Sequence, residues 1–147
     1  MAAYSFLNIS CMMVGPGIAS NLAAGASVAE EGITLERTTD KNVMTIGADG
    51  TGMHSLVADD SCTLTIRFLK TSPLNAALQI AFDLQSVSSA LWGSNTFTLS
   101  DSARGDFSVV QQAAFKKGVT ITYAKEGGMM EWTFDGIQVN SILGGEI

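Results

Sequence analysis

The residue types best suited to nucleophilic catalysis or soft-metal binding are one histidine, His54, and two cysteines, Cys11 and Cys62. A Ser-His-Asp or Cys-His site would have to be built around this one histidine, which follows a glycine-rich stretch. The cysteines lie far apart in apolar runs without CxxC spacing or a histidine cluster. We therefore interpret His54 as a surface or interface residue and the cysteines as small buried side chains. A disulfide between them stays possible only if the fold brings them together.

Adjacent acidic pairs, Glu30-Glu31 and Asp59-Asp60, are candidates for acid-base catalysis. Neighbouring residues in a strand point to opposite faces, so neither pair has the geometry to share a proton. The run GADGTG at 47–52 lacks the Lys-Ser/Thr of a phosphate-binding loop, and Asp49 lacks the ligand spacing of a calcium loop. The sequence thus predicts no catalytic, cofactor-binding or metal-binding residue, and an enzyme is the least favoured class.

The composition points to surface that is covered by other protein chains. The chain has 147 residues, which fits one domain over 1–147, yet only 15% are charged, against about 25% in an average soluble domain. The mean hydropathy is +0.26. Because no apolar run reaches the roughly 18 residues that span a bilayer, no membrane segment is predicted. Self-assembly explains the charge deficit best.

The net charge of −6 has the wrong sign for gripping nucleic acid through its phosphates. An acidic surface still suits a conduit through which DNA passes, because like charge removes the attraction that would hold it.

Strict alternation of apolar and polar residues predicts strands with one face on a core. It is longest from Cys62 to Phe68 and recurs at 33–36, 96–99, 119–123 and 130–135. Weaker strands are expected over 4–14, 43–46, 107–115 and 137–143. Lys125-Glu126-Gly127-Gly128 predicts a hairpin that pairs 119–124 with 129–135, and 47–53 is expected to be a long loop.

A helix is predicted over about 73–87, with Ser72 as its cap and Pro73 in its first turn. Leu74, Leu78 and Phe82 recur at helical spacing. Because strands and helices do not alternate regularly, the predicted fold is mainly β: an antiparallel β-sandwich or barrel with this one flanking helix.

The sequence resembles the tail tube proteins of contractile-tailed bacteriophages. The resemblance rests on the run GADGTGMHSLVADDSCTLTIRFLKTSPLNAAL at 47–78, where a glycine-rich loop leads to a Thr-alternating strand and a TSP-N helix start. It extends through VAEEGITLERTTDKNVMTIG at 28–47, SDSARGD at 100–106 and TYAKEGGMMEW at 122–132. The ordered combination of these segments carries it.

The resemblance implies a structural subunit that closes with five copies of itself into a hexameric ring. The rings would stack into a hollow tube inside a contractile sheath, and the tube would form the conduit for genome ejection. The expected partners are further copies of the chain, the tail sheath protein, the tape measure protein and the baseplate or terminator proteins. DNA would pass through the lumen without specific binding. The expected location is the tail of the virion, after assembly in the cytoplasm of the host bacterium.

Two alternatives stay open. One is the tube of a phage-derived contractile injection device, and the other, from a different class, is a small-molecule-binding β-barrel.

Residues 38–60 combine polar connections and glycine with little that could build a core of their own. We expect this segment to pack on the next ring. Met53 and Val57 would supply apolar contacts there, and Asp49 and His54 polar ones.

Overall fold

The structure is a computed structural model that describes residues 9–22 and 28–144, with side chains in the second stretch from residue 32 onward. The described elements are, in chain order, β1 Ile9–Gly15, β2 Ile18–Asn21, β3 Val28–Arg37, β4 Asn42–Ile46, β5 Gly52–Leu56, β6 Cys62–Leu69, α1 Leu74–Gln85, β7 Asn95–Asp101, β8 Asp106–Phe115 and β9 Met129–Ile142.

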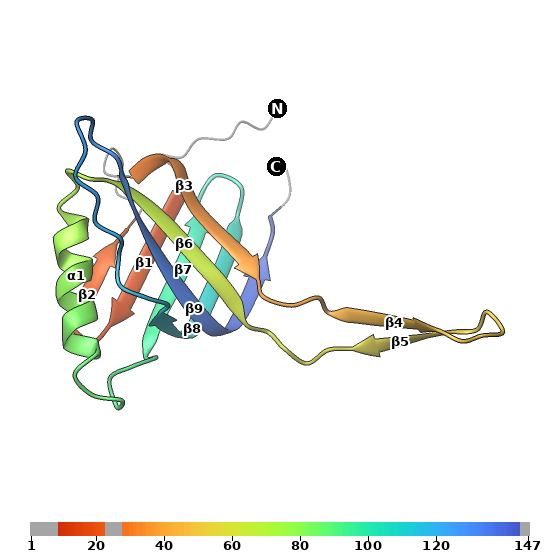
Figure 1. Ribbon diagram of the computed structural model, residues 1–147. Helices are drawn as coiled ribbons and strands as arrows, with labels where there is room; N and C mark the ends of the chain where they lie inside the picture. The colour runs from red at the N-terminus through yellow and green to blue at the C-terminus, as the bar shows by residue number, and fades with distance from the viewer. Residues whose placement is uncertain (1–8, 23–27, 145–147) are drawn as a thin grey trace.

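Within this described part, seven strands form one antiparallel sheet in the order β2-β1-β7-β8-β9-β6-β3. The sheet curls, so that β3 and β6 pass in front of β1 and β7, and α1 flanks it on one side (Figure 1). β4 and β5 pair with each other as a separate ribbon, inserted between β3 and β6. The predicted mainly β, antiparallel fold with one flanking helix is confirmed.

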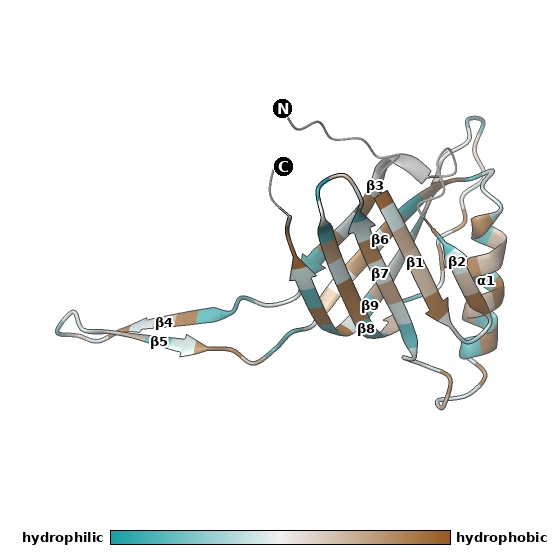
Figure 2. Cartoon of the chain, turned by 180° about the vertical axis from the view of Figure 1, so that it is seen from behind, coloured by the Kyte–Doolittle hydropathy of each residue, from teal (hydrophilic) through white to brown (hydrophobic). Residues whose placement is uncertain are grey.

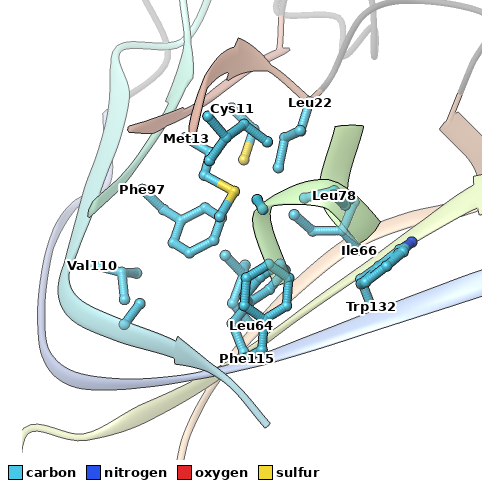
Figure 3. Packing of buried hydrophobic residues seen from close by; sticks show 14 of the residues in the cluster. Cys11, Met13, Leu22, Leu64, Ile66, Leu78, Phe97, Val110, Phe115 and Trp132 are labelled. Carbon is cyan, nitrogen blue, oxygen red and sulfur yellow. The ribbon is translucent and has the colours of Figure 1, made fainter. Parts of the chain in front are cut away.

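The core lies inside the curl and is built from inward-facing residues of alternating strands. Cys62, Leu64, Ile66 and Phe68 of β6 are buried, while the residues between them are half-buried on the outer face. Figure 3 shows the β6 side chains Leu64 and Ile66 packed with Met13 of β1, Phe97 of β7, Phe115 of β8 and Leu78 of α1. The apolar residues of the alternating pattern that predicted this strand are therefore the residues that face the core.

Helix α1 begins and ends within two residues of its predicted limits. The predicted cap is wrong by one position: the N-cap is Pro73, whose side chain has no group that can accept a capping hydrogen bond. The Ser72 hydroxyl still accepts a hydrogen bond from the Leu74 amide at 3.3 Å. The buried positions Asn75, Leu78, Ala81 and Gln85 form one face of the helix. Asn75 also accepts a hydrogen bond from the indole N–H of Trp132 at 3.1 Å, which fixes the helix on β9.

Two irregularities curl the sheet. The register of β3 on β6 shifts between Val28 and Ile33, where Gly32 has φ +63°. The register of β7 on β8 shifts at Gln112, which adopts φ +53°. An extra residue in one strand of a pair bends that strand and increases the local twist.

The predicted strand over 119–124 is wrong, and so is its hairpin with 129–135, because the segment is not a strand. After β8 the chain turns toward the helix, where Gly118 lies against the Phe82 ring and Val119 packs on the core. This packing holds the segment away from β9. The gap of about 280 Å³ between them is lined by residues that include Thr120, Thr122 and Glu131. Alternation alone does not make a strand when the backbone lies too far from a neighbouring edge to form ladder hydrogen bonds.

The long loop predicted over 47–53 is also wrong. Only the turn between Gly47 and Thr51 is irregular, and Gly52 already begins β5. The two strands predicted over 129–135 and 137–143 are one strand, β9, with Gly136 buried in its middle. Strand β2 was not predicted, because four residues are too few to display a period. Residues 4–8 of the first predicted strand lie outside the described residues.

Candidate functional site

Among the side chains that the structure describes, those that could do chemistry do not meet. His54 is exposed, and its Nδ1 lies 3.1 Å from the side-chain nitrogen Nδ2 of Asn42. Over residues 9–22 and 28–144, no three His, Cys, Asp or Glu side chains gather as a metal site would require. Within the same residues, no helix has the length and apolar character to cross a bilayer.

The acidic pair Asp59-Asp60 has a structural role. Asp59 accepts hydrogen bonds from the Ser61 amide at 2.8 Å and from the Thr39 hydroxyl at 3.0 Å, and these bonds lower the pKa of its carboxyl group. Asp60 forms an ion pair with Lys41, and its Oδ1 lies 3.7 Å from Nη1 of Arg37. The pair thus joins the two chain segments that lead out to β4 and back from β5. The side chains of Glu30-Glu31 lie outside the described residues.

The two cysteines are buried and free, as predicted. Burial raises the pKa of the Cys11 thiol to about 12, and burial likewise raises the pKa of Cys62. Both thiols therefore stay protonated, and a protonated thiol is a poor nucleophile.

We expect neither native thiol to react with Ellman's reagent at about pH 8 while the protein is folded. Both should react in denaturant, because unfolding restores an ordinary pKa and access to solvent. The matched control is Val87→Cys, which places a thiol at a position that is 81% exposed and should react at once. Rapid labelling of two thiols in the folded parent protein would contradict the buried assignment.

The most unusual feature of the molecule is the ribbon of β4 and β5, which we call the arm (residues 38–61). Figure 1 shows the arm extending away from the curled sheet. All five residues of β4 and four of the five in β5 are exposed. Large apolar side chains are among them: Val43, Met44, Ile46, Met53 and Leu56.

Figure 2 shows the hydrophobic colouring on this projecting ribbon. An isolated two-stranded ribbon is marginally stable in water, so this arm requires a covering surface.

The direction of the arm is fixed at its base. The Thr38 amide donates to the Ser61 carbonyl at 3.1 Å, and the Val57 amide donates to the Lys41 carbonyl at 2.8 Å. The ion pair between Lys41 and Asp60 lies between these two rungs. These contacts continue the pairing of β3 with β6 into the arm, so that it leaves the sheet in a defined direction.

The tip of the arm is a turn stabilised by Asp49. Its Oδ1 accepts hydrogen bonds from the amide and the hydroxyl of Thr51, at 3.1 Å and 2.7 Å. These bonds lower the pKa of Asp49. Gly50 has φ +90°, which a residue with a side chain adopts at a cost.

The structure places Asp49, Met53, His54 and Val57 on this one arm, from tip to base. They do not share a face, however. The pairs Thr45–Met53 and Met44–His54 are successive in the ladder, so Met53 and His54 point to opposite sides. Met44, Ile46 and Leu56 lie on the His54 side and were not predicted as contact residues. The sequence does carry a pattern that could have predicted them. Two short apolar segments, NVMTI and GMHSL, lie on either side of a five-residue turn, as in a β-hairpin.

The outer face of the sheet has a second unusual surface over β1, β7 and β8. Its outward residues in these described strands carry no charge, and by register they include Ser10, Met12, Val14, Thr96, Thr98, Ser100, Phe107, Val109 and Gln111. Over β6 and β9, by contrast, Arg67 pairs with Glu131 at 3.1 Å and Asp135 is exposed. A face of apolar and uncharged polar side chains is typical of an interface rather than of a freely solvated sheet.

A groove of about 230 Å³ opens at one end of the core. Ile33 and Leu35 of β3 line one side, and Ile9 and Leu99 line the other. All four also pack against the buried core. Here the curl leaves part of the core accessible to a ligand or partner.

The sequence matches a known protein family over almost its whole length. The model of the family described as bacteriophage PhiTE tail tube protein matches residues 1–144. A search of curated protein sequences finds no significant relative.

Three solved structures share the fold at low sequence identity. The tube-terminating cap of the anti-feeding prophage is 8% identical, with a TM-score of 0.57 over 97% of this chain and 93% of that chain. A chain of the PVC sheath-tube complex, from an extracellular contractile injection system in its extended state, is 11% identical, with a TM-score of 0.53 over 92% of this chain and 88% of that chain. A chain of the PVC sheath/tube terminator is 12% identical, with a TM-score of 0.55 over 97% and 98%.

At these identities the solved structures establish the fold alone, whereas the family model covers nearly the whole sequence. The chain belongs to the bacteriophage PhiTE tail tube protein family.

Proposed function

We propose that this chain is the repeating structural subunit of a phage tail tube. Six copies close into a ring, and the rings stack into a hollow tube inside a contractile sheath. The tube is the conduit for genome ejection, and its place is the tail of the virion, assembled in the host cytoplasm. Its function is containment and passage, and no catalysis is involved.

The observation that carries this proposal is the arm. Its two legs of about 12 residues each reach roughly 40 Å at about 3.3 Å per residue. A body of about 120 residues has a radius of gyration near 14 Å, hence a diameter of roughly 35 Å. The arm is therefore long enough to cross a neighbouring subunit. Its apolar side chains lie on both faces, which suits a ribbon held between neighbours, and Asp49, Met53, His54 and Val57 are proposed contacts with the next ring.

The remaining partners follow from the same role. The sheath covers the outside of the tube, the tape measure protein occupies the lumen before DNA does, and baseplate and terminator proteins close the two ends. The net charge of −6 per chain favours DNA that slides through without binding.

The fold neighbours come from a tube-terminating cap, a sheath/tube terminator and a sheath-tube complex, so proteins of this fold are found both at the end of such an assembly and within it. A repeating subunit extends into tubes of indefinite length, whereas a cap stops growth. Two of these neighbours belong to an extracellular contractile injection system, which keeps the tube of such a device as a second candidate. Family membership favours a tail tube over a small-molecule-binding barrel.

The test is removal of the arm. Residues 42–56 would be replaced by a short Gly-Ser turn, which can close because the backbones of Lys41 and Val57 are already hydrogen-bonded. We expect the body to fold with an unchanged β-type circular dichroism spectrum, and rings to persist while stacking fails in electron micrographs. Met44→Leu is the matched control and should stack normally. Tubes of normal length from the armless variant would contradict the proposal.

A further inference from the structure

We propose that the arm of one subunit docks into the groove of a second copy, with Leu56 as the anchoring side chain. This rests on the proposed tube function and names the surface that receives the arm. The contact joins two different surfaces of the same chain, so it is heterologous and propagates from copy to copy.

The groove needs a cover, because it exposes core residues. Its apolar lining consists of Ile9, Ile33, Leu35, Leu99, Phe107 and Leu143. Phe107 and Leu143 form its rim and are exposed, Leu143 to 81%. An apolar side chain that entered here would continue the packing of the core rather than start a new surface patch.

The arm offers a matching face. The ladder places Met44, Ile46 and Leu56 on the same side, and Leu56 is 87% exposed. Leu56 is also the residue of this face nearest the base, where the hydrogen bonds and the ion pair hold the arm most firmly. The backbone around Leu56 is therefore already held in place before docking, which lowers the entropy cost of association.

The two surfaces cannot satisfy each other within one chain. The arm leaves the sheet and extends away from it, and its base is held in that direction (Figure 1). Each copy thus presents one projecting apolar face and one open apolar groove. Its arm can enter the groove of a second copy, and its groove can receive the arm of a third.

Charge does not oppose the contact. Between Asn42 and Leu56 the only carboxylate is Asp49, at the far tip. In the groove, Asp101 accepts hydrogen bonds from the amides of Ala103 and Arg104, and Asp106 accepts one from Gly144 at 2.7 Å. Those acceptors keep their partners on docking, so little desolvation cost arises.

The experiment is a cross-link between single-cysteine positions on two populations of molecules. Leu56→Cys protein is mixed with Leu143→Cys protein, assembled, and treated with a short bis-maleimide. We expect a covalent dimer whose linked peptides contain positions 56 and 143, with at least tenfold higher yield than the control mixture of Leu56→Cys with Val87→Cys. Val87 is 81% exposed but lies beyond the helix, away from the groove lining. The buried native thiols should not compete.

Three outcomes decide the matter. Tubes that form normally from the mixed Leu56→Cys and Leu143→Cys proteins without the 56–143 product overturn the docking and leave the tube function standing. A parent protein that never forms tubes contradicts the tube function, while the 56–143 dimer at high concentration would still report the docking. A product within one chain between Phe6→Cys and Leu143→Cys, in place of the 56–143 product, would assign the groove to the chain's own first residues and overturn the proposal.

Discussion

Leu78→Asp is expected to abolish folding. Leu78 is fully buried where α1 meets the sheet, within the cluster that includes Ile66 and Phe97. Removing a buried leucine side chain alone costs about 2–5 kcal/mol, and the new carboxylate finds no cation among the residues that pack there. A domain has about 5–15 kcal/mol of stability in total, so the variant should accumulate as insoluble protein.

The matched control is Ile80→Asp on the same helix. Ile80 is 64% exposed, so this variant introduces the same charge without burying it. It should be soluble, with a circular dichroism spectrum and a melting temperature close to those of the parent. A soluble and native-like Leu78→Asp protein would show that the inner face of the helix is misassigned.

Asn95→Ala is expected to cost about 2–4 kcal/mol, which is large for the loss of one small polar side chain. Asn95 and Gln85 are fully buried and bonded to each other through both amides, at 2.8 Å and 2.7 Å. Gln85 also donates to the Pro16 carbonyl at 3.0 Å, and Asn95 donates to the Ala113 carbonyl at 3.1 Å. The pair therefore ties α1, the turn after β1, β7 and β8 together. The free energy of unfolding from urea titration gives the cost.

A double-mutant cycle with Gln85→Met separates the pair from general packing. In Asn95→Ala the Gln85 amide stays buried with most of its partners lost, whereas Gln85→Met/Asn95→Ala removes that orphaned group. The double variant should therefore lose less stability than the two single variants combined, by about 0.5–3 kcal/mol. Strictly additive costs, or an Asn95→Ala variant within about 0.5 kcal/mol of the parent, would refute the coupling.

The prediction of a self-assembling structural protein needed no coordinates, because charge content and strand alternation are visible in the sequence. The contact residues themselves were only partly predictable. Met53 and His54 were identified because they follow a glycine-rich stretch, but Leu56 was not, although the structure makes it the most exposed large apolar side chain of the arm.

The sequence by itself determined the elements whose signals are local. The inward side chains of β6 follow from a period of two, and the inner face of α1 follows from helical spacing, because each pattern is set by the backbone geometry of its own segment. It also determined that the thiols would be buried, since each lies on the apolar side of its strand.

Only the tertiary structure decided which segments with a strand pattern become strands. Residues 119–124 alternate well but pack toward Phe82 and stay apart from β9, whereas the less regular residues 52–56 form a strand because 42–46 lies opposite them. A strand exists only with a partner edge, and the available edges depend on the whole topology. The same holds for the groove, whose lining meets only because the curl brings β3 across from β1 and β7.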